Sequence, residues 1–180
     1  MTFDKIISDG RLWAVRYDND KDNALQNVMS QWSDAYWLAD FFTQNFDDLI
    51  TYFKITNIED AIYQTMEDRD ELSCIIMDIS PEADIDNFFR PLENERTSEM
   101  LLGKEKGRLH RRSWLRLYAI KISVGIYIVT GGAIKLTHTM QERKHTLHEL
   151  EKMEKVRNFL IREHVFDEDS FIDYQKEIVL

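Results

Sequence analysis

The sequence has little cysteine, proline or glycine, with one, two and six residues of these types among 180. A single cysteine, Cys74, forms neither an intramolecular disulfide nor a cysteine-based metal site. Its apolar context, LSCIIM, predicts a buried thiol. No stretch rich in proline, glycine or serine divides the chain, and its length suits one sizeable core. We therefore expect a single α+β domain over residues 1–180.

Long apolar runs are also missing, because no segment has the roughly 18 to 20 consecutive apolar residues that a membrane span requires. The first ten residues, MTFDKIISDG, do not place a basic region before an apolar one, unlike a secretory signal. Hydrophobic residues make up 43% and aromatic residues 12%, which excludes global disorder. These features predict a soluble, cytoplasmic protein with no membrane partner.

Charge is unevenly distributed along the chain. The formal net charge is −10, yet the segment from Gly103 to Thr146 has ten Lys or Arg against two Glu, so it carries +8 and the remainder −18. Such asymmetry is typical of an anion-binding surface on an acidic body. The same pattern also fits a basic loop that pairs internally with acidic helices, and the sequence leaves both interpretations open.

The most regular apolar pattern lies between residues 113 and 137. WLRLYAIKI, IYIVT and AIKLT alternate or cluster β-branched and aromatic residues, which predicts three strands. Turns at Ser123–Gly125 and Gly131–Gly132 would join them as an antiparallel meander. The earlier segment Arg11–Asp18 also reads as a strand, and we expect it in the same small sheet, because three strands alone would leave an edge and an apolar face exposed.

Helices are predicted on both sides of this pattern. Residues 20–80 form a helical segment in which Asp34 (or Ser33) and Asn57 are candidate caps. Residues 93–113 form a charged insert that we expect to be a poorly ordered loop. Thr139 and Glu142 have capping-box spacing and predict a long helix over 139–164, packed with the other helices against the sheet.

Motifs for metal or cofactor chemistry are weak. Asp84 and Asp86 are a carboxylate pair in a predicted loop, which is more typical of a solvated turn than of a cation site. Glu142, His145 and His148 resemble half of a carboxylate–histidine metal motif without a second half, so a solvated helix face is expected. We therefore predict no metal and no cofactor.

Several pieces in order resemble the RelE/HigB-like toxin family, the ribosome-dependent mRNA interferases of bacterial type II toxin–antitoxin pairs. The pieces are Phe89-Arg90-Pro91-Leu92, Trp114-Leu115-Arg116-Leu117, Ile126 to Thr130, GAIKLT from Gly132 to Thr137, and a Glu- and Arg-rich helix from about Met140. The resemblance implies a RelE-like fold, a metal-independent mRNA endonuclease, and an antitoxin protein and ribosome-bound mRNA as partners, with no direct DNA contact. The chain departs from the family in its 93–113 insert and its acidic helical segment.

Candidate site residues follow from this resemblance and from placement. Arg116 and Lys135 match the family's strand arginine and the lysine of its G-x-x-K-x-T segment. RNA transesterification also needs proton transfer and charge neutralisation, which Tyr and His support without a metal. From charge and placement we add Tyr118 and His138 as catalytic candidates and Arg111, Arg112 and Arg143 as RNA contacts. The alternative is a non-catalytic RNA- or protein-binding module on the same fold.

Strand parity restricts which of these residues share a site. Arg116 and Tyr118 are two apart, so they lie on one face of their strand, whereas Lys121 lies on the opposite face.

Overall fold

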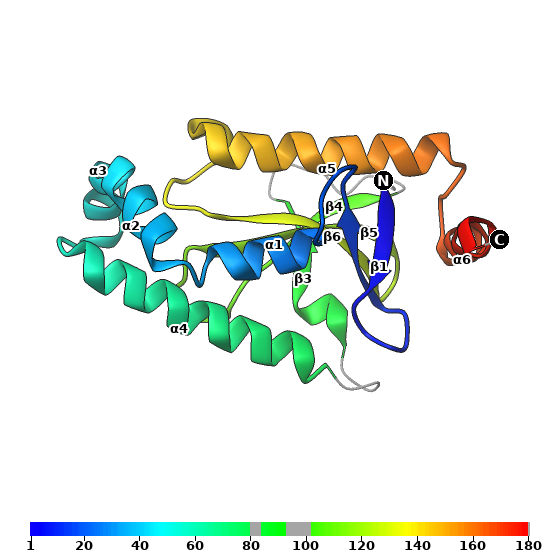
Figure 1. Cartoon of the computed structure of the whole chain (residues 1–180), viewed down its shortest axis with the longest axis horizontal. Helices are drawn as coiled ribbons and strands as arrows, with labels where there is room; N and C mark the ends of the chain where they lie inside the picture. The colour runs from blue at the N-terminus through cyan, green and yellow to red at the C-terminus, as the bar shows by residue number, and fades with distance from the viewer. Residues whose placement is uncertain (80–83, 93–101, 180) are drawn as a thin grey trace.

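The computed structural model describes residues 1–79, 84–92 and 102–179 and forms an α+β fold around a six-stranded sheet (Figure 1). The strands are β1 (Thr2–Lys5), β2 (Leu12–Arg16), β3 (Phe89–Pro91), β4 (Gly103–Gly107), β5 (Leu115–Ser123) and β6 (Ile126–Ile134). Their order across the sheet is β1-β2-β6-β5-β4-β3. Neighbours are antiparallel except β2 and β6, which run parallel. The sheet is therefore mixed, and larger than the small antiparallel sheet expected.

The helices cover both faces of the sheet. They are α1 (Ala24–Gln31), α2 (Ala35–Gln44), α3 (Phe46–Asp48), the π-helical turn η1 (Leu49–Phe53), α4 (Ile58–Met77), the 3-10 turns η2 (Ile85–Asn87) and η3 (Met140–Glu142), α5 (Lys144–Arg162) and α6 (Glu168–Val179). In Figure 1, α5 lies along one face, and α1 and α4 lie along the other. The predicted helical segment at 20–80 is confirmed as α1 to α4.

Local capping explains where the early helices begin. The side chain of Asn23 accepts from the backbone N–H of Gln26, and the Gln26 side chain accepts in return from the N–H of Asn23. Asp34 accepts from two N–H groups at the start of α2, and Asn57 accepts from the N–H of Glu59 at the start of α4. Each cap satisfies donors that have no partner within the helix. The predicted caps Asp34 and Asn57 are confirmed.

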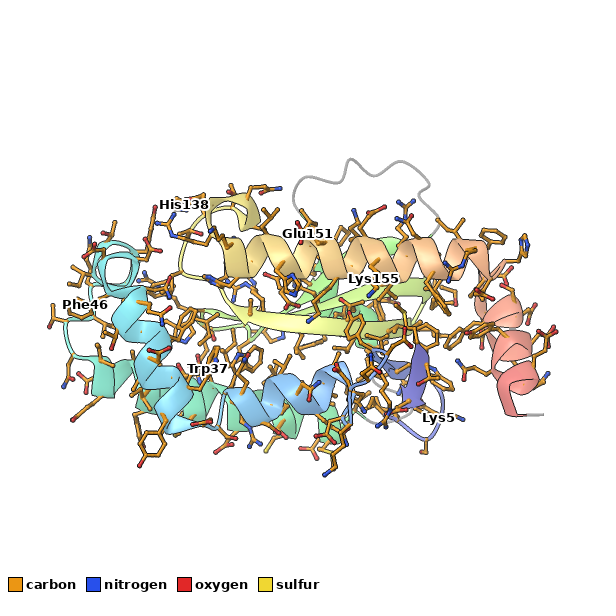
Figure 2. All side chains as sticks on the ribbon, turned by 45° about the horizontal axis from the view of Figure 1, so that its top comes forward. Lys5, Trp37, Phe46, His138, Glu151 and Lys155 are labelled. Carbon is orange, nitrogen blue, oxygen red and sulfur yellow. The ribbon has the colours of Figure 1, made fainter. Side chains whose placement is uncertain are left out.

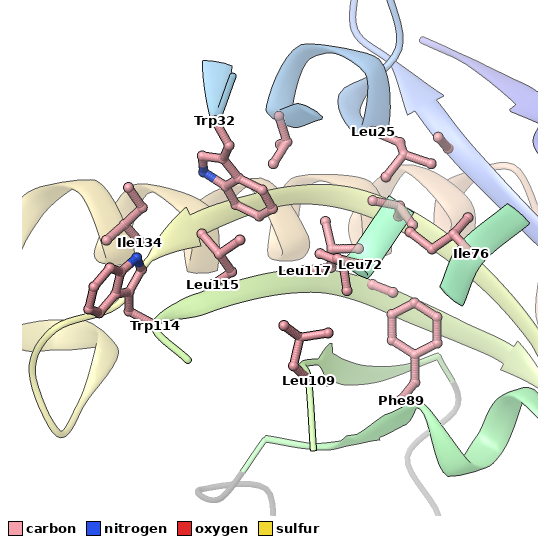
Figure 3. Close-up of a cluster of buried hydrophobic side chains, with 14 of the residues drawn as sticks. Leu25, Trp32, Leu72, Ile76, Phe89, Leu109, Trp114, Leu115, Leu117 and Ile134 are labelled. Atoms are coloured by element: carbon pink, nitrogen blue, oxygen red, sulfur yellow. The ribbon is translucent and has the colours of Figure 1, made fainter. Parts of the chain in front are cut away.

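Two apolar clusters lie on opposite faces of the sheet. Leu115, Leu117 and Ala119 of β5 face α1 and α4, in the cluster drawn in Figure 3 with Trp32, Leu72 and Trp114. The alternate residues Tyr118, Ile120 and Ile122 face α5, with Met153, Val156 and Leu160. The strict period of two is that of a strand buried on both faces. Arg116 shares the α5 face with Tyr118, as strand parity predicts.

The predicted N-terminal strand is confirmed, because β2 pairs with β6 through Leu12, Trp13 and Ala14. The expected hairpin at Gly131–Gly132 is wrong, since both glycines lie inside β6. The other predicted turn, at Ser123–Gly125, is confirmed, because β5 and β6 are joined by a turn at Val124–Gly125. Three predicted strands at 113–137 are therefore two long ones.

Close packing explains the two glycines of β6. A Cβ on Gly132 would lie 2.8 Å from the backbone oxygen of Arg116 and 2.9 Å from Cγ1 of Val28 in α1. A Cβ on Gly131 would lie 2.0 Å from a carboxylate oxygen of Glu149 in α5. The register also shifts beside them, because Tyr118 pairs with Gly131 while Ala119 pairs with Val129. Here glycine admits a helix on each face rather than a turn.

Three further expectations are corrected. Gly103–Gly107 of the predicted insert loop form β4, with Leu102 and Leu109 buried beside it; residues 93–101 lie outside the described residues. The Thr139–Glu142 capping box is present but closes the turn η3, and the long helix α5 begins at Lys144. Cys74 is exposed rather than buried, because α4 turns Leu72 and Ile76 to the core instead.

Candidate functional site

Side chains from three strands form a row on the α5 face of the sheet. Arg90 of β3 pairs with Lys106 of β4, Lys106 pairs with Tyr118 of β5, and Tyr118 pairs with Gly131 of β6. Directly paired residues in antiparallel strands project to the same face, with Cβ atoms about 5 Å apart. The sheet thus aligns two cations and a tyrosine across the width of three strands.

Beside this row lies a small cavity, about 90 Å³ in volume, that we name the basic hollow. Its lining residues are Leu92, Lys106, Arg108, Arg116, Tyr118, Lys135, His138, Thr139, Met140 and Gln141. Four of the described lining residues are Lys or Arg, and none of them is Asp or Glu. All four predicted catalytic residues, from β5 and from the 135–138 segment, lie together here. A cluster of cations at one small cavity suits an anion.

Tyr118 is the buried member of the basic hollow. Its side chain is 1% exposed, and its hydroxyl has no hydrogen-bond partner among the described residues. Burial is the main cause of the raised pKa of Tyr118. The charge of Arg116 lowers this pKa by a smaller amount, and the charge of Glu149 raises it further. The hydroxyl therefore stays protonated at neutral pH.

Backbone contacts fix Arg116 and Lys135. The Nη1 of Arg116 donates to the carbonyls of Ser113 at 2.8 Å and Leu115 at 2.7 Å. The backbone N–H of Lys135 donates to Trp114 O at 2.8 Å, just past the end of β6, and its ammonium donates to the carbonyl of His138. These contacts orient the two cations.

His138 lies at the turn before α5, as Figure 2 shows. Its ring is exposed and meets the ring of Tyr52 edge-on at 5.0 Å. The next residue, Thr139, has its backbone N–H bound by Glu142, and this hydrogen bond is the main cause of the lowered pKa of Glu142. The capping box therefore holds the turn that presents His138 at the rim of the basic hollow.

The three predicted RNA contacts lie outside the basic hollow and are engaged elsewhere. Arg111 forms ion pairs of 2.6 Å with Asp68 and with Glu71, both in α4. Arg143 binds both carboxylate oxygens of Asp48, at 2.6 and 2.7 Å.

Arg112 donates to the carbonyl of Tyr52 and lies over the ring of Phe53. For these three arginines the second interpretation of the charge pattern holds, because two of them neutralise acidic residues of the helical segment. They join that segment to the strands.

The other polar motifs also have structural partners. Asp84 is exposed, as expected, and caps η2, whereas Asp86 is not merely solvated, because it accepts from Lys121 at 2.7 Å and from Tyr127. These bonds lower the pKa of Asp86 although burial opposes them. Lys121 lies on the face opposite Arg116, as parity predicts.

Neither helix histidine is part of a metal cluster. The Nε2 of His145 lies 2.9 Å from the carbonyl of Ile134, and His148 lies 3.7 Å from Glu151. Across the described ranges no group of three His, Cys, Asp or Glu side chains is placed to hold a metal ion.

Lys106 and Arg108 are the site residues that the sequence alone does not identify. Both belong to the charged insert, where GKEKGR gives no sign of which charge faces which side. Pairing of β4 with β5 places Lys106 opposite Tyr118, and Arg108 follows the end of that strand. The one available signal in the sequence was the alternation of Lys104, Glu105 and Lys106 between two glycines, which is compatible with a strand.

A larger groove, about 540 Å³ in volume, separates α1 from α5 and is named the α1–α5 groove. Its described lining residues are Tyr17, Asp20, Ala24, Asn27, Val28, Gln31, Gly132, His148, Glu149, Glu151, Lys152 and Lys155. Glu149 is 7% exposed, and burial raises its pKa although Lys152 binds both its oxygens, at 2.9 and 3.1 Å. This groove mixes both signs of charge, unlike the basic hollow.

No family model, curated protein or solved structure matches the chain. Among the helices described, none combines the length and apolar character needed to cross a bilayer.

Proposed function

We propose that this protein is a RelE/HigB-like toxin that cuts ribosome-bound mRNA without a metal ion, and that a cognate antitoxin protein is its partner. The observation that carries the proposal is the meeting of Arg116, Tyr118, Lys135 and His138 at one hollow whose described lining contains no carboxylate. An anionic substrate is favoured at such a site. The family resemblance of Arg116 and Lys135 supports RNA as that substrate.

The residues supply what phosphodiester transesterification requires. The 2′-oxygen of a ribose attacks the adjacent phosphorus and loses its proton, the bond from phosphorus to the 5′-oxygen breaks, and that oxygen gains a proton. The products are a 2′,3′-cyclic phosphate and a 5′-hydroxyl. Arg116 and Lys135 would stabilise the charge that develops on the phosphoryl oxygens. His138, in its neutral form, is suited to accept the 2′-proton.

Tyr118 is suited to the donor role. Burial raises its pKa, so it holds its proton at neutral pH and does not act as a base. Its buried hydroxyl, without a partner among the described residues, would gain one when a phosphoryl or leaving oxygen enters the hollow.

Size also bears on the substrate. A volume of about 90 Å³ admits a phosphodiester group but not an entire nucleotide, so the remainder of a bound strand would lie on the surrounding surface. This arrangement favours a polymer over a free nucleotide held in a deep pocket.

Induced expression in bacteria tests the proposal. Wild-type protein should arrest growth, and Arg116→Ala and Lys135→Ala should each relieve the arrest. Lys121→Gln is the matched control, because Lys121 lies on the same strand as Arg116 but on the opposite face and binds Asp86; it should remain toxic. The variants must accumulate as folded protein, checked by circular dichroism.

The non-catalytic module predicts a different result. A binder would cause no arrest, and Arg116→Ala would only weaken RNA binding and reduce its salt dependence. Absence of arrest by the wild-type protein, in cells where it accumulates in folded form, would therefore contradict the toxin proposal.

A further inference from the structure

A second cavity, about 130 Å³ in volume, adjoins the basic hollow at the β3 edge of the sheet, and we name it the second hollow. Its lining residues are Asn87, Phe88, Arg90, Lys106, Arg108, Leu109 and His110. It shares Lys106 and Arg108 with the basic hollow. None of its described lining residues is acidic. Two cation-lined cavities therefore lie side by side and share the side chains of Lys106 and Arg108.

Two cations of the second hollow, Arg90 and Arg108, have no partner in the described part of the chain. Arg90 and Arg108 are both exposed, and in the described part of the chain neither side chain takes part in an ion pair or hydrogen bond. By contrast, Arg111 and Arg143 are paired with carboxylates. Exposed cations such as Arg90 and Arg108, without a carboxylate partner in the described part of the chain, attract an external anion.

The second hollow also contains an aromatic ring in a fixed position. Phe88 is half-buried and lies against the strand at Gly107, where a Cβ would come within 2.3 Å of its Cε1 atom. Phe89 meets the same ring edge-on, with centroids 4.9 Å apart and planes at 83°. Glycine at position 107 thus lets the ring lie on the backbone of β4, held from two sides.

An aromatic ring next to unneutralised cations is what single-stranded nucleic acid requires, because bases stack on the ring while the phosphates meet Lys and Arg. Asn87 adds an exposed amide that offers both a donor and an acceptor to a base edge. We propose that the second hollow is a nucleotide subsite that binds the RNA strand next to the phosphate held in the basic hollow. The base stacks on Phe88, and Arg90 and Arg108 contact the flanking phosphate.

This inference rests on the proposed function, and binding is therefore measured with RNA that cannot be cut. A fluorescent eight-nucleotide RNA with every 2′-oxygen methylated lacks the attacking hydroxyl, so its affinity reports contacts alone. Fluorescence anisotropy would be recorded over a range of salt concentrations for the wild-type protein and five variants: Phe88→Leu, Phe88→Trp, Arg90→Ala, Arg116→Ala and the surface control Lys176→Ala.

Each variant has a distinct expected result. Phe88→Leu keeps an apolar side chain on Gly107 but loses stacking, so binding should weaken about tenfold with an unchanged salt slope, and Phe88→Trp should retain affinity. Arg90→Ala should lower the slope by about 0.7, the value for one single-strand phosphate contact. Lys176 is exposed in α6, so Lys176→Ala should leave binding unchanged.

Wild-type affinity in both Phe88→Leu and Arg90→Ala, with weaker binding by Arg116→Ala, would overturn the subsite and leave the proposed function standing. Binding of no oligonucleotide by the wild-type protein at low salt would also overturn the subsite; cleavage on the ribosome would then decide the function separately. Binding that Arg90→Ala weakens but Phe88→Leu does not would show a charged surface without base stacking, and would overturn the nucleotide assignment.

Discussion

Replacing Tyr118 by Phe should raise stability and lower activity at once. The substitution removes a single oxygen that is buried and has no hydrogen-bond partner among the described residues. Leaving such a group unsatisfied costs about 1 to 3 kcal/mol, whereas the ring itself keeps its packing. We expect the free energy of unfolding to rise by about 1 kcal/mol, which corresponds to about 2 to 4 °C in Tm for a chain of this size.

Activity should move the other way, because the same hydroxyl is the protonated donor of the basic hollow. A positioned acid or base contributes about 100- to 10,000-fold to a rate. Tyr118→Phe should therefore cut mRNA at least about 100 times more slowly while it binds RNA with nearly unchanged affinity. A merely structural tyrosine would not combine higher stability with lower activity.

Tyr127→Phe is the matched control. Tyr127 is equally buried at 1% exposure, but it faces the opposite side of the sheet, and its hydroxyl donates to Asp86. Its loss should destabilise the protein by about 1.5 to 3 kcal/mol, as for hydrogen bonds to charged groups, and leave cleavage unchanged. Urea unfolding and a cleavage time course measure both effects. A destabilised Tyr118→Phe protein, or one that cuts at the wild-type rate, would refute the reasoning.

Two other predictions concern the strand β6 and the helix packed on it. Gly132→Ala should destabilise the fold by about 1 to 3 kcal/mol in urea unfolding, because the new methyl group would overlap the carbonyl of Arg116 and Val28. Gly103→Ala, whose Cβ meets nothing nearer than 3.6 Å, should change stability by less than about 0.5 kcal/mol, and equal effects would contradict the strand assignment. Burial raises the pKa of Glu149 above its ordinary 4.5. Between the ordinary and the raised pKa, the folded chain therefore holds a proton that the unfolded chain has released. The stability from this group is therefore present below about pH 4.5 and is lost as pH rises through the raised pKa; Glu149→Gln should remove that loss in unfolding curves measured across pH, and identical pH profiles would disprove it.

Local signals in the sequence were sufficient for much of the fold. Asp34 and Asn57 cap helices because a short polar side chain before an amphipathic run satisfies free N–H groups wherever it occurs. Strand parity likewise placed Arg116 and Tyr118 on one face and Lys121 on the other. These features depend on residues within a few positions of each other, so no tertiary information was needed.

Features set by distant contacts were not predictable in the same way. Gly131 and Gly132 read as a turn because adjacent glycines permit positive φ, but here their small size admits Val28 from α1 and Glu149 from α5. Cys74 has apolar neighbours in sequence, yet the rotation of α4 exposes it. Which face of an element is covered depends on its partner, and the partner is remote in sequence.

The candidate site shows the same division. Arg116 and Lys135 were found by resemblance to a motif, and Tyr118 and His138 by placement near them. Lys106 could be identified only from the structure, where it pairs with Tyr118. The sequence of the charged insert does not specify this register of β4 on β5. The ion pairs of Arg111 and Arg143 were not predictable, because their partners, Asp68 and Asp48, lie on helices far away in the chain.

Cleavage of a defined mRNA in a purified translation system tests the central claim most directly. The wild-type protein should cut the message only when ribosomes are present, and the fragments should end in a 2′,3′-cyclic phosphate and a 5′-hydroxyl. Arg116→Ala removes a charge-stabilising donor, so its cleavage rate should fall by a factor on the order of 100 or more. Absence of cleavage by the wild-type protein, or equal cleavage by Arg116→Ala, would contradict the assignment of the basic hollow as the active site.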